Sequence, residues 1–234
     1  MLKVLSIAIF ILVLLLTSSL TSSAEGQNSV NIFPPESEPY GLPYEEHIKN
    51  FWKWVLSIPS NLNPWIDDNG ENCLSGQIGT NSSVFYLSGN GGGKSDRTCK
   101  VPAGKGLFIP VSPMELNYKE APGSTLEDLH SLTKKDQDSL TSINLQIGDK
   151  VYDRPELEKY RRHTNDFDVV FPKNPVFGVT EGPTTAVADG YYVITEPLRK
   201  GNYTILYTTS LLCLEADCPE PNFVQDLKYK LIVE

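Results

Sequence analysis

Two carboxylates spaced to share a strand face are the first candidates for chemistry. Apolar and acidic residues alternate over 163–171, so a strand would place Asp166 and Asp168 on one face. A carboxyl pair can supply the general acid and base of a hydrolase that acts on glycans. A solvated outer strand face explains the same pattern. The acid–base candidates of the chain are Glu115, Asp166, Asp168 and Glu181.

Aromatic rings are the second set of candidates, because flat ring faces complement the apolar faces of sugars. Core packing is the alternative fate of each ring. The predicted ring platform for a glycan consists of Trp54, Trp65, Tyr191 and Tyr192.

A turn-rich stretch carries oxygen-bearing side chains at alternate positions, as a calcium loop does. They are Asp67, Asn69 and Glu71, with Gly70 among them. The match is partial, because the full loop pattern and its closing bidentate Glu are missing. A solvated turn explains the stretch without an ion, and calcium is the only cofactor that the sequence suggests.

The chain has three histidines and no motif of a known reaction: neither a G-x-S-x-G nucleophile elbow nor an H-E-x-x-H zinc motif occurs. Its formal net charge of −9 and pI of about 4.9 disfavour nucleic acid and anionic lipid as partners. Whether the chain is an enzyme is left open, and a role in binding is favoured.

Four cysteines predict two disulfides, since an even number in an exported chain indicates a disulfide framework. Of the three pairings, Cys73–Cys99 with Cys213–Cys218 strains the chain least. The first bond would stabilise the fold by about 3 kcal/mol through loop closure. Metal binding is the alternative, but paired C-x-x-C spacing is absent.

Residues 1–24 have the parts of a secretory signal peptide. Lys3 supplies the positive start, an apolar run follows, and Ser22 to Ala24 form a small-residue cleavage site. We therefore expect a secreted or cell-surface protein without membrane contact after cleavage. Two sequons, at Asn81 and Asn202, are candidates for N-glycosylation.

The elements that position these residues follow from composition and periodicity. Residues 25–42, rich in Ser, Asn and Pro, predict a flexible leader. An amphipathic helix is predicted from Tyr44 to Pro59. Ser124 and Glu127, at capping-box spacing, predict a short second helix over 124–138.

The rest of the chain consists mainly of short strand-like segments separated by turn signals. This pattern predicts a mainly β fold, an antiparallel β-sandwich of the jelly-roll or immunoglobulin-like type. With the amphipathic helix at its start and the short second helix, it forms a single domain over 43–234.

Three stretches resemble an uncharacterised family of exported bacterial and archaeal proteins. They are FWKWVLSIP at 51–59, RTCKVPAGK at 97–105 and AVADGYY at 186–192. The resemblance covers most of the chain after the signal peptide and implies a secreted β-rich domain. It carries over no catalytic residues, and the loop 213–218 departs from it.

Together these features predict a secreted, disulfide-bonded protein that acts in extracellular binding or as a structural or matrix protein, with glycans as a candidate ligand. Its partner would be an extracellular polysaccharide or another surface protein. A secreted glycan hydrolase with a carboxylate pair is one alternative. A cell-surface component that self-assembles through exposed strand edges is another.

Overall fold

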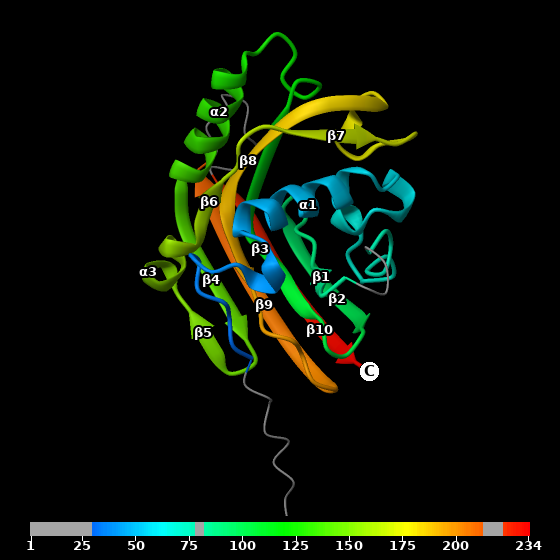
Figure 1. The fold of residues 1–234 in the computed structure, drawn as a ribbon, viewed down its shortest axis with the longest axis vertical. Coiled ribbons are helices and arrows are strands. Elements are labelled where there is room, and N and C mark those ends of the chain that lie inside the picture. The colour runs from blue at the N-terminus through cyan, green and yellow to red at the C-terminus, as the bar shows by residue number, and fades with distance from the viewer. Residues whose placement is uncertain (1–29, 78–81, 213–221) are drawn as a thin grey trace, which may run out of the picture.

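The computed structural model describes residues 30–77, 82–212 and 222–234 (Figure 1). The predicted signal peptide, the sequon at Asn81 and the predicted bond Cys213–Cys218 lie outside these ranges and stay predictions. Within them, no helix is both long enough and apolar enough to cross a membrane.

Helix α1 spans Tyr44–Leu56 and packs its apolar face into the core. Pro43 precedes the helix, where its missing N–H costs nothing, and two glutamates in the first turn complement the helix dipole. The predicted apolar face is buried, and so are His47 and Trp54 on its flank. The helix is therefore a core element on more than one side.

The strands form two sheets of five strands. The first sheet has the order β1-β3-β8-β6, with β7 also paired to β8, and the second has the order β2-β10-β9-β4-β5. The first sheet contains β1 (Val84–Tyr86), β3 (Gly106–Asn117), β6 (Arg161–His163), β7 (Phe167–Phe171) and β8 (Gly182–Ile194). The second contains β2 (Gly93–Val101), β4 (Leu140–Ile147), β5 (Lys150–Tyr152), β9 (Gly201–Leu212) and β10 (Asn222–Val233).

The fold is mainly β, as predicted, but the sheets are mixed rather than purely antiparallel. Strand β1 pairs with β3 in parallel, and β2 pairs with β10 in parallel. The first of these pairings arises because β2, which lies between β1 and β3 in the chain, belongs to the other sheet. The chain thus leaves the first sheet and re-enters it in the same direction.

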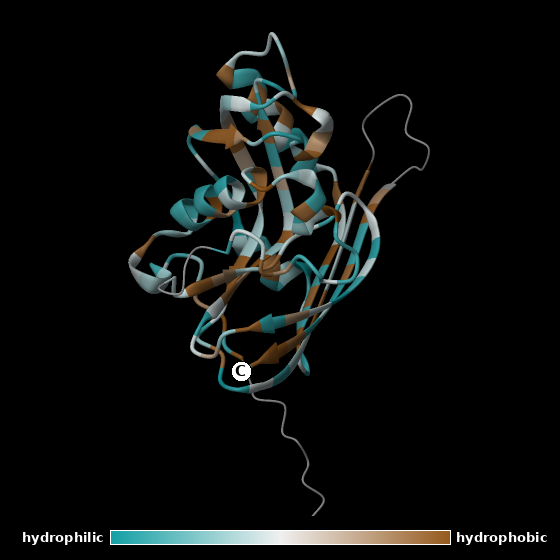
Figure 2. Cartoon of the chain, turned by 90° about the vertical axis from the view of Figure 1, so that its right-hand side faces the viewer, coloured by the Kyte–Doolittle hydropathy of each residue, from teal (hydrophilic) through white to brown (hydrophobic). Residues whose placement is uncertain are grey.

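Hydrophobic and hydrophilic residues alternate along the strands (Figure 2). In β9, Tyr203, Ile205 and Tyr207 are buried, whereas Asn202 and Thr208 are exposed. The second sheet therefore has one buried face and one face in contact with water.

The first sheet is covered on both faces (Figure 1). On one face, Phe51 of α1 stacks on Phe108 with ring centroids 5.1 Å apart, and Trp52 Nε1 donates to the Tyr192 hydroxyl at 3.2 Å. From the other side, Thr209 Oγ1 of the second sheet donates to the Val111 carbonyl at 2.6 Å. These contacts make the first sheet the central layer.

Helix α2 (Leu126–Asp138) packs against β3 and β8 of the first sheet. Its capping box consists of Thr125 and Asp128, one residue later than the predicted pair. The remaining short helices are α3 (Arg154–Leu157) and the 3₁₀ turns η1 (Pro39–Gly41), η2 (Ser60–Leu62), η3 (Pro64–Ile66), η4 (Glu158–Tyr160) and η5 (Val176–Gly178).

Cys73 and Cys99 form the predicted disulfide, with their Cα atoms 5.8 Å apart. The bond joins the loop that follows η3 to strand β2. It therefore fixes the segment after α1 to the second sheet.

The side chain of Arg97, also on β2, is buried. Its guanidinium donates to the carbonyl oxygens of Asp67, Ser88 and Gly89 and to the hydroxyl of Tyr229. Arg97 therefore links the loop after η3 and the loop after β1 to strand β10.

Replacing this cation by an apolar side chain should destabilise the fold strongly. In Arg97→Met the three buried carbonyl groups lose their Arg97 donor, and we expect a loss of about 3 kcal/mol or more in unfolding free energy. Guanidinium chloride unfolding measures it. Lys94→Met is the matched control, because that side chain is on the same strand and 86% exposed. A loss in Arg97→Met no larger than in the control would contradict the assignment.

Candidate functional site

The four aromatic rings predicted to bind sugar are buried. Trp54 is 3% exposed, Trp65 7%, Tyr191 4% and Tyr192 0%. Trp54 Nε1 donates to the Ser75 carbonyl at 3.0 Å. The four rings are therefore packed in the core, the alternative that the sequence left open, because Trp54 lies on α1, Trp65 on η3, and Tyr191 and Tyr192 on the buried strand β8.

The predicted calcium ligands belong to a loop whose oxygens bind its own amides. The Asp67 carboxylate accepts from the backbone N–H groups of Asn69, Gly70 and Asn72 at 3.1, 3.0 and 2.7 Å. Asn69 Oδ1 accepts from the Glu71 N–H at 3.1 Å. Among the described residues no group of three or more His, Cys, Asp or Glu side chains could hold a metal ion.

The four acid–base candidates differ in their burial. Glu115 is buried, whereas Asp166, Asp168 and Glu181 are exposed. Asp168 accepts from Thr185 Oγ1 at 3.3 Å. The structure instead gives Glu115 a partner that was not predicted.

That partner is Glu120, which a turn folds back toward the strand. Strand β3 ends at Asn117, whose carbonyl accepts from the N–H groups of Glu120 and Ala121 at 3.2 and 3.0 Å. Asn117 Oδ1 accepts from the Lys119 and Glu120 N–H groups at 2.9 and 3.2 Å. Asn117 Nδ2 donates to Glu115 Oε1 at 3.1 Å and to Glu120 Oε2. One amide thus holds both carboxyl groups.

Burial changes the proton affinity of this pair. It raises the pKa of Glu120 to about 7. Hydrogen bonds with Glu115 and Asn117 act in the opposite direction and lower this pKa, but burial has the larger effect. Burial, and then the charge of Glu120, raise the pKa of Glu115 well above its ordinary value. Near neutral pH Glu120 is therefore ionised in part, and the pKa of its neighbour Glu115 is raised as well. The pair offers both a donor and an acceptor.

Glu120 opens onto a hollow of about 540 Å³. On its other side lies η5, where Phe177 has a φ of 68° and is 40% exposed. A left-handed backbone at a bulky residue costs about 1–2 kcal/mol, so surrounding contacts must hold it in place. The ring packs edge-on against Trp65, with centroids 5.6 Å apart. Lys119 Nζ, which donates to the Thr180 and Glu181 carbonyls at 2.9 and 2.6 Å, holds the loop in place.

Sequence reasoning found Glu115 but missed Glu120, Asn117 and Phe177. The one available signal was the spacing of Glu115 and Asn117, which puts both on the same strand face. Nothing in the sequence showed that the turn would return Glu120 to that face. Phe177 belongs to a segment without strand or helix periodicity.

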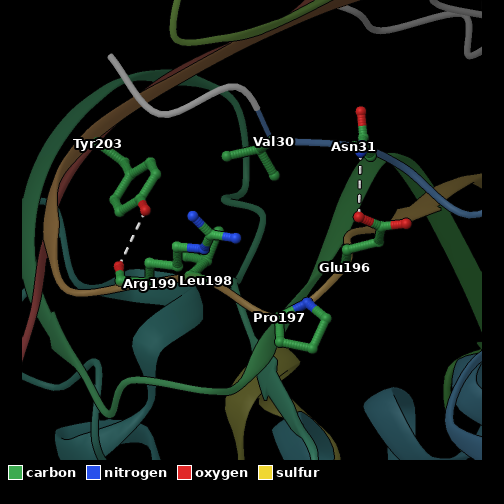
Figure 3. Close-up of a pocket in the computed structure, with 7 residues that line it drawn as sticks. All are labelled: Val30, Asn31, Glu196, Pro197, Leu198, Arg199 and Tyr203. Atoms are coloured by element: carbon green, nitrogen blue, oxygen red, sulfur yellow. Dashed lines mark hydrogen bonds between the residues drawn. The ribbon is translucent and has the colours of Figure 1, made fainter. Parts of the chain in front are cut away.

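A different hollow, of about 280 Å³, lies beside Val30 and the start of β9 (Figure 3). Its polar groups bind one another: Asn31 Nδ2 donates to Glu196 Oε2 at 3.1 Å, and the Tyr203 hydroxyl donates to the Arg199 carbonyl at 2.9 Å. We assign no role to this hollow.

Comparisons of the chain with protein-family models, with curated proteins and with solved structures give no match. The resemblance of three stretches to an exported family stays a prediction. The candidate site therefore rests on its own geometry.

The raised pKa values predict how stability depends on pH. Above the ordinary glutamate value of about 4.5, the folded protein binds more protons at this pair than the unfolded chain does. The pair's contribution to the unfolding free energy therefore falls as the pH rises from about 5 to about 8. Glu120→Gln, a neutral isostere, should reduce that fall by about 2 kcal/mol in urea unfolding.

The control for this measurement is Glu181→Gln, since that side chain is exposed. It should keep the pH dependence of the original protein. Identical pH dependence in Glu120→Gln and the original protein would show that the pair is ionised in the ordinary range.

Proposed function

We propose that the protein binds a neutral glycan outside the cell, at the hollow between Glu120 and Phe177. The observation that carries the proposal is an exposed ring, held in left-handed backbone, across a hollow from a partly ionised carboxyl group. The ring platform is therefore Phe177 rather than any of the four rings predicted from sequence.

The chemistry of the hollow suits a sugar. The exposed face of Phe177 can pack against the C–H face of a pyranose ring. The carboxyl group of Glu120, which lines the hollow, can donate to one hydroxyl group and accept from another, since it is ionised in part near neutral pH. A net charge of −9 favours a neutral ligand over a polyanion.

Export is part of the same proposal. The predicted signal peptide motivates it, and the disulfide Cys73–Cys99 is the type of bond that persists in an oxidising compartment. Asn202 of the second sequon is exposed on β9, so its side chain is accessible to a glycosylating enzyme.

Hydrolysis of a glycan is the second candidate function. The raised pKa of Glu120 favours it, because a general acid must hold its proton near the working pH. The spacing favours binding, since one Asn117 amide group contacts both carboxyl groups. Glycosidase carboxyl groups stand about 5 Å or more apart to leave room for the scissile bond.

A self-assembling surface component receives less support. The edge strand β2 of the second sheet carries Lys94, Asp96 and Lys100 on its exposed side. Charged side chains on an edge strand oppose pairing with a further strand.

The proposal predicts that Phe177→Ala weakens binding of neutral oligosaccharides about fivefold, because the ring contact is worth about 1 kcal/mol. A glycan array selects the oligosaccharide, and isothermal titration calorimetry measures its affinity. Phe223→Ala is the matched control, because Phe223 is a ring of similar exposure, 39%, on β10. Equal affinity in both variants, or no binding of any neutral oligosaccharide, would contradict the proposed function.

A further inference from the structure

The turn 118–123 connects the end of β3 to the segment before α2 and is partly exposed. On the strand side, the Tyr118 N–H donates to the Thr185 carbonyl at 3.3 Å. On the outer side, Pro122 and Gly123 are exposed, and a methyl group on Gly123 would meet no described atom within 4 Å apart from those of its chain neighbours. The turn therefore has open space into which it can move.

A contact between side chains joins this turn to the interior of the fold. Asn117 Nδ2 donates to the buried Glu115 and to the half-buried Glu120. Two carboxyl groups that contact the same amide nitrogen repel each other strongly when both are ionised. The closed turn therefore favours a proton on the pair, whereas a turn that releases Glu120 into water does not.

The charged and phenolic side chains of the elements around this pair are exposed or bound to other groups. Lys119 Nζ, on the turn itself, donates to the Thr180 and Glu181 carbonyls. The exposed side chains are Lys53 of α1, Tyr118 of the turn, Asp168 of β7, Lys173 before η5 and Glu181 before β8.

The remaining groups lie on β8 and α2. Asp189 of β8 is paired with Arg161, and Asp136 of α2 accepts from Gln137 Nε2 at 3.0 Å. Burial raises the pKa of Tyr192 on β8, so its phenol stays neutral. Among the described residues, no cation lies within salt-bridge distance of Glu115 or Glu120. The pair therefore lacks a positive charge that would stabilise two carboxylates.

The position of Glu120 is linked to its protonation. In the closed turn, burial raises the pKa of Glu120 to about 7, whereas a glutamate in water has its ordinary value of 4.5. The closed turn is therefore favoured most below about pH 4.5, and this preference is lost as the pH rises to about 7. For a fully solvated carboxyl group in the open turn, the ratio of open to closed turn can rise by up to about 300-fold over this range.

We propose that the turn 118–123 is closed in mildly acidic solution and opens as the pH rises through neutrality, with Glu115, Asn117 and Glu120 as the groups that hold it closed. Because Glu120 lines the hollow beside Phe177, opening of the turn also changes this hollow. The inference concerns the turn itself and does not depend on whether a glycan binds there.

Amide hydrogen exchange measured by NMR tests the opening. The reporters are the N–H groups of Glu120 and Ala121, which donate to the Asn117 carbonyl. Dividing the intrinsic exchange rate by the observed rate removes the pH dependence of the exchange chemistry and gives a protection factor. We expect the protection factors to be about tenfold or more lower at about pH 8 than at about pH 5.

A second turn shows whether the change is local. The N–H groups of Leu62 and Asn63 in η2 donate to the Pro59 and Ser60 carbonyls, and their protection should stay the same at both pH values. Unchanged protection at Glu120 and Ala121 would overturn the proposal. An equal fall at η2 would also overturn it, because the whole fold would then loosen.

Variants test the role of the carboxyl pair. Glu120→Gln, which cannot ionise, should keep the higher protection of Ala121 at both pH values. Glu181→Gln, at an exposed carboxylate, should keep the fall seen in the original protein. The same fall in Glu120→Gln as in the original protein would overturn the assignment to this pair. No glycan enters these measurements, so failure of the proposed function would leave their outcome unaffected.

Discussion

The positively charged guanidinium of Arg97 is buried away from water. Among the described residues its hydrogen bonds go to neutral carbonyl and hydroxyl oxygens, and none goes to a carboxylate. Tyr229 and Tyr207 stack with ring centroids 6.2 Å apart, and both hydroxyl groups donate to the Ser88 carbonyl at 2.7 Å. Burial raises the pKa of Tyr207 well above its ordinary value, so this phenol stays neutral. Because Arg97 also contacts the carbonyl of Trp65 at 3.5 Å, it positions the ring on which Phe177 packs.

Local patterns in the sequence predicted α1, α2 and most strands but not their arrangement. The prediction of a flexible leader is wrong for residues 30–42, because Ile32 bridges Thr195 and the Phe33 N–H donates to the Ile194 carbonyl at the end of β8. The apolar face of α1 and the disulfide Cys73–Cys99 follow from helical periodicity and from cysteine parity, and both are present. The parallel pairing of β1 with β3 depends on β2 crossing to the other sheet, which periodicity does not encode. The burial of Trp65 could not be predicted for the same reason, since it depends on how the loop that contains it packs in the fold.

The pairing of Glu115 with Glu120 likewise could not be predicted from local sequence patterns. Glu115 is visible as an acidic residue within an apolar strand, but its partner reaches it only because Asn117 holds a turn and both carboxyl groups together. Burial then supplies the raised pKa values, and η5 supplies a ring in strained backbone on the opposite wall. The buried carboxyl groups and the left-handed backbone at Phe177 each lower the stability of the fold. Their presence together at one hollow supports a binding role.

The most direct test of this account is a pH titration of the glutamate carboxyl carbons by ¹³C NMR, with Glu115→Gln and Glu120→Gln to assign the signals. The account predicts that Glu120 loses its proton near pH 7 and that Glu115 loses its proton well above the ordinary glutamate range. Ionisation of both carboxyl groups below about pH 5 would contradict it, because the pair would then have no proton to donate at neutral pH.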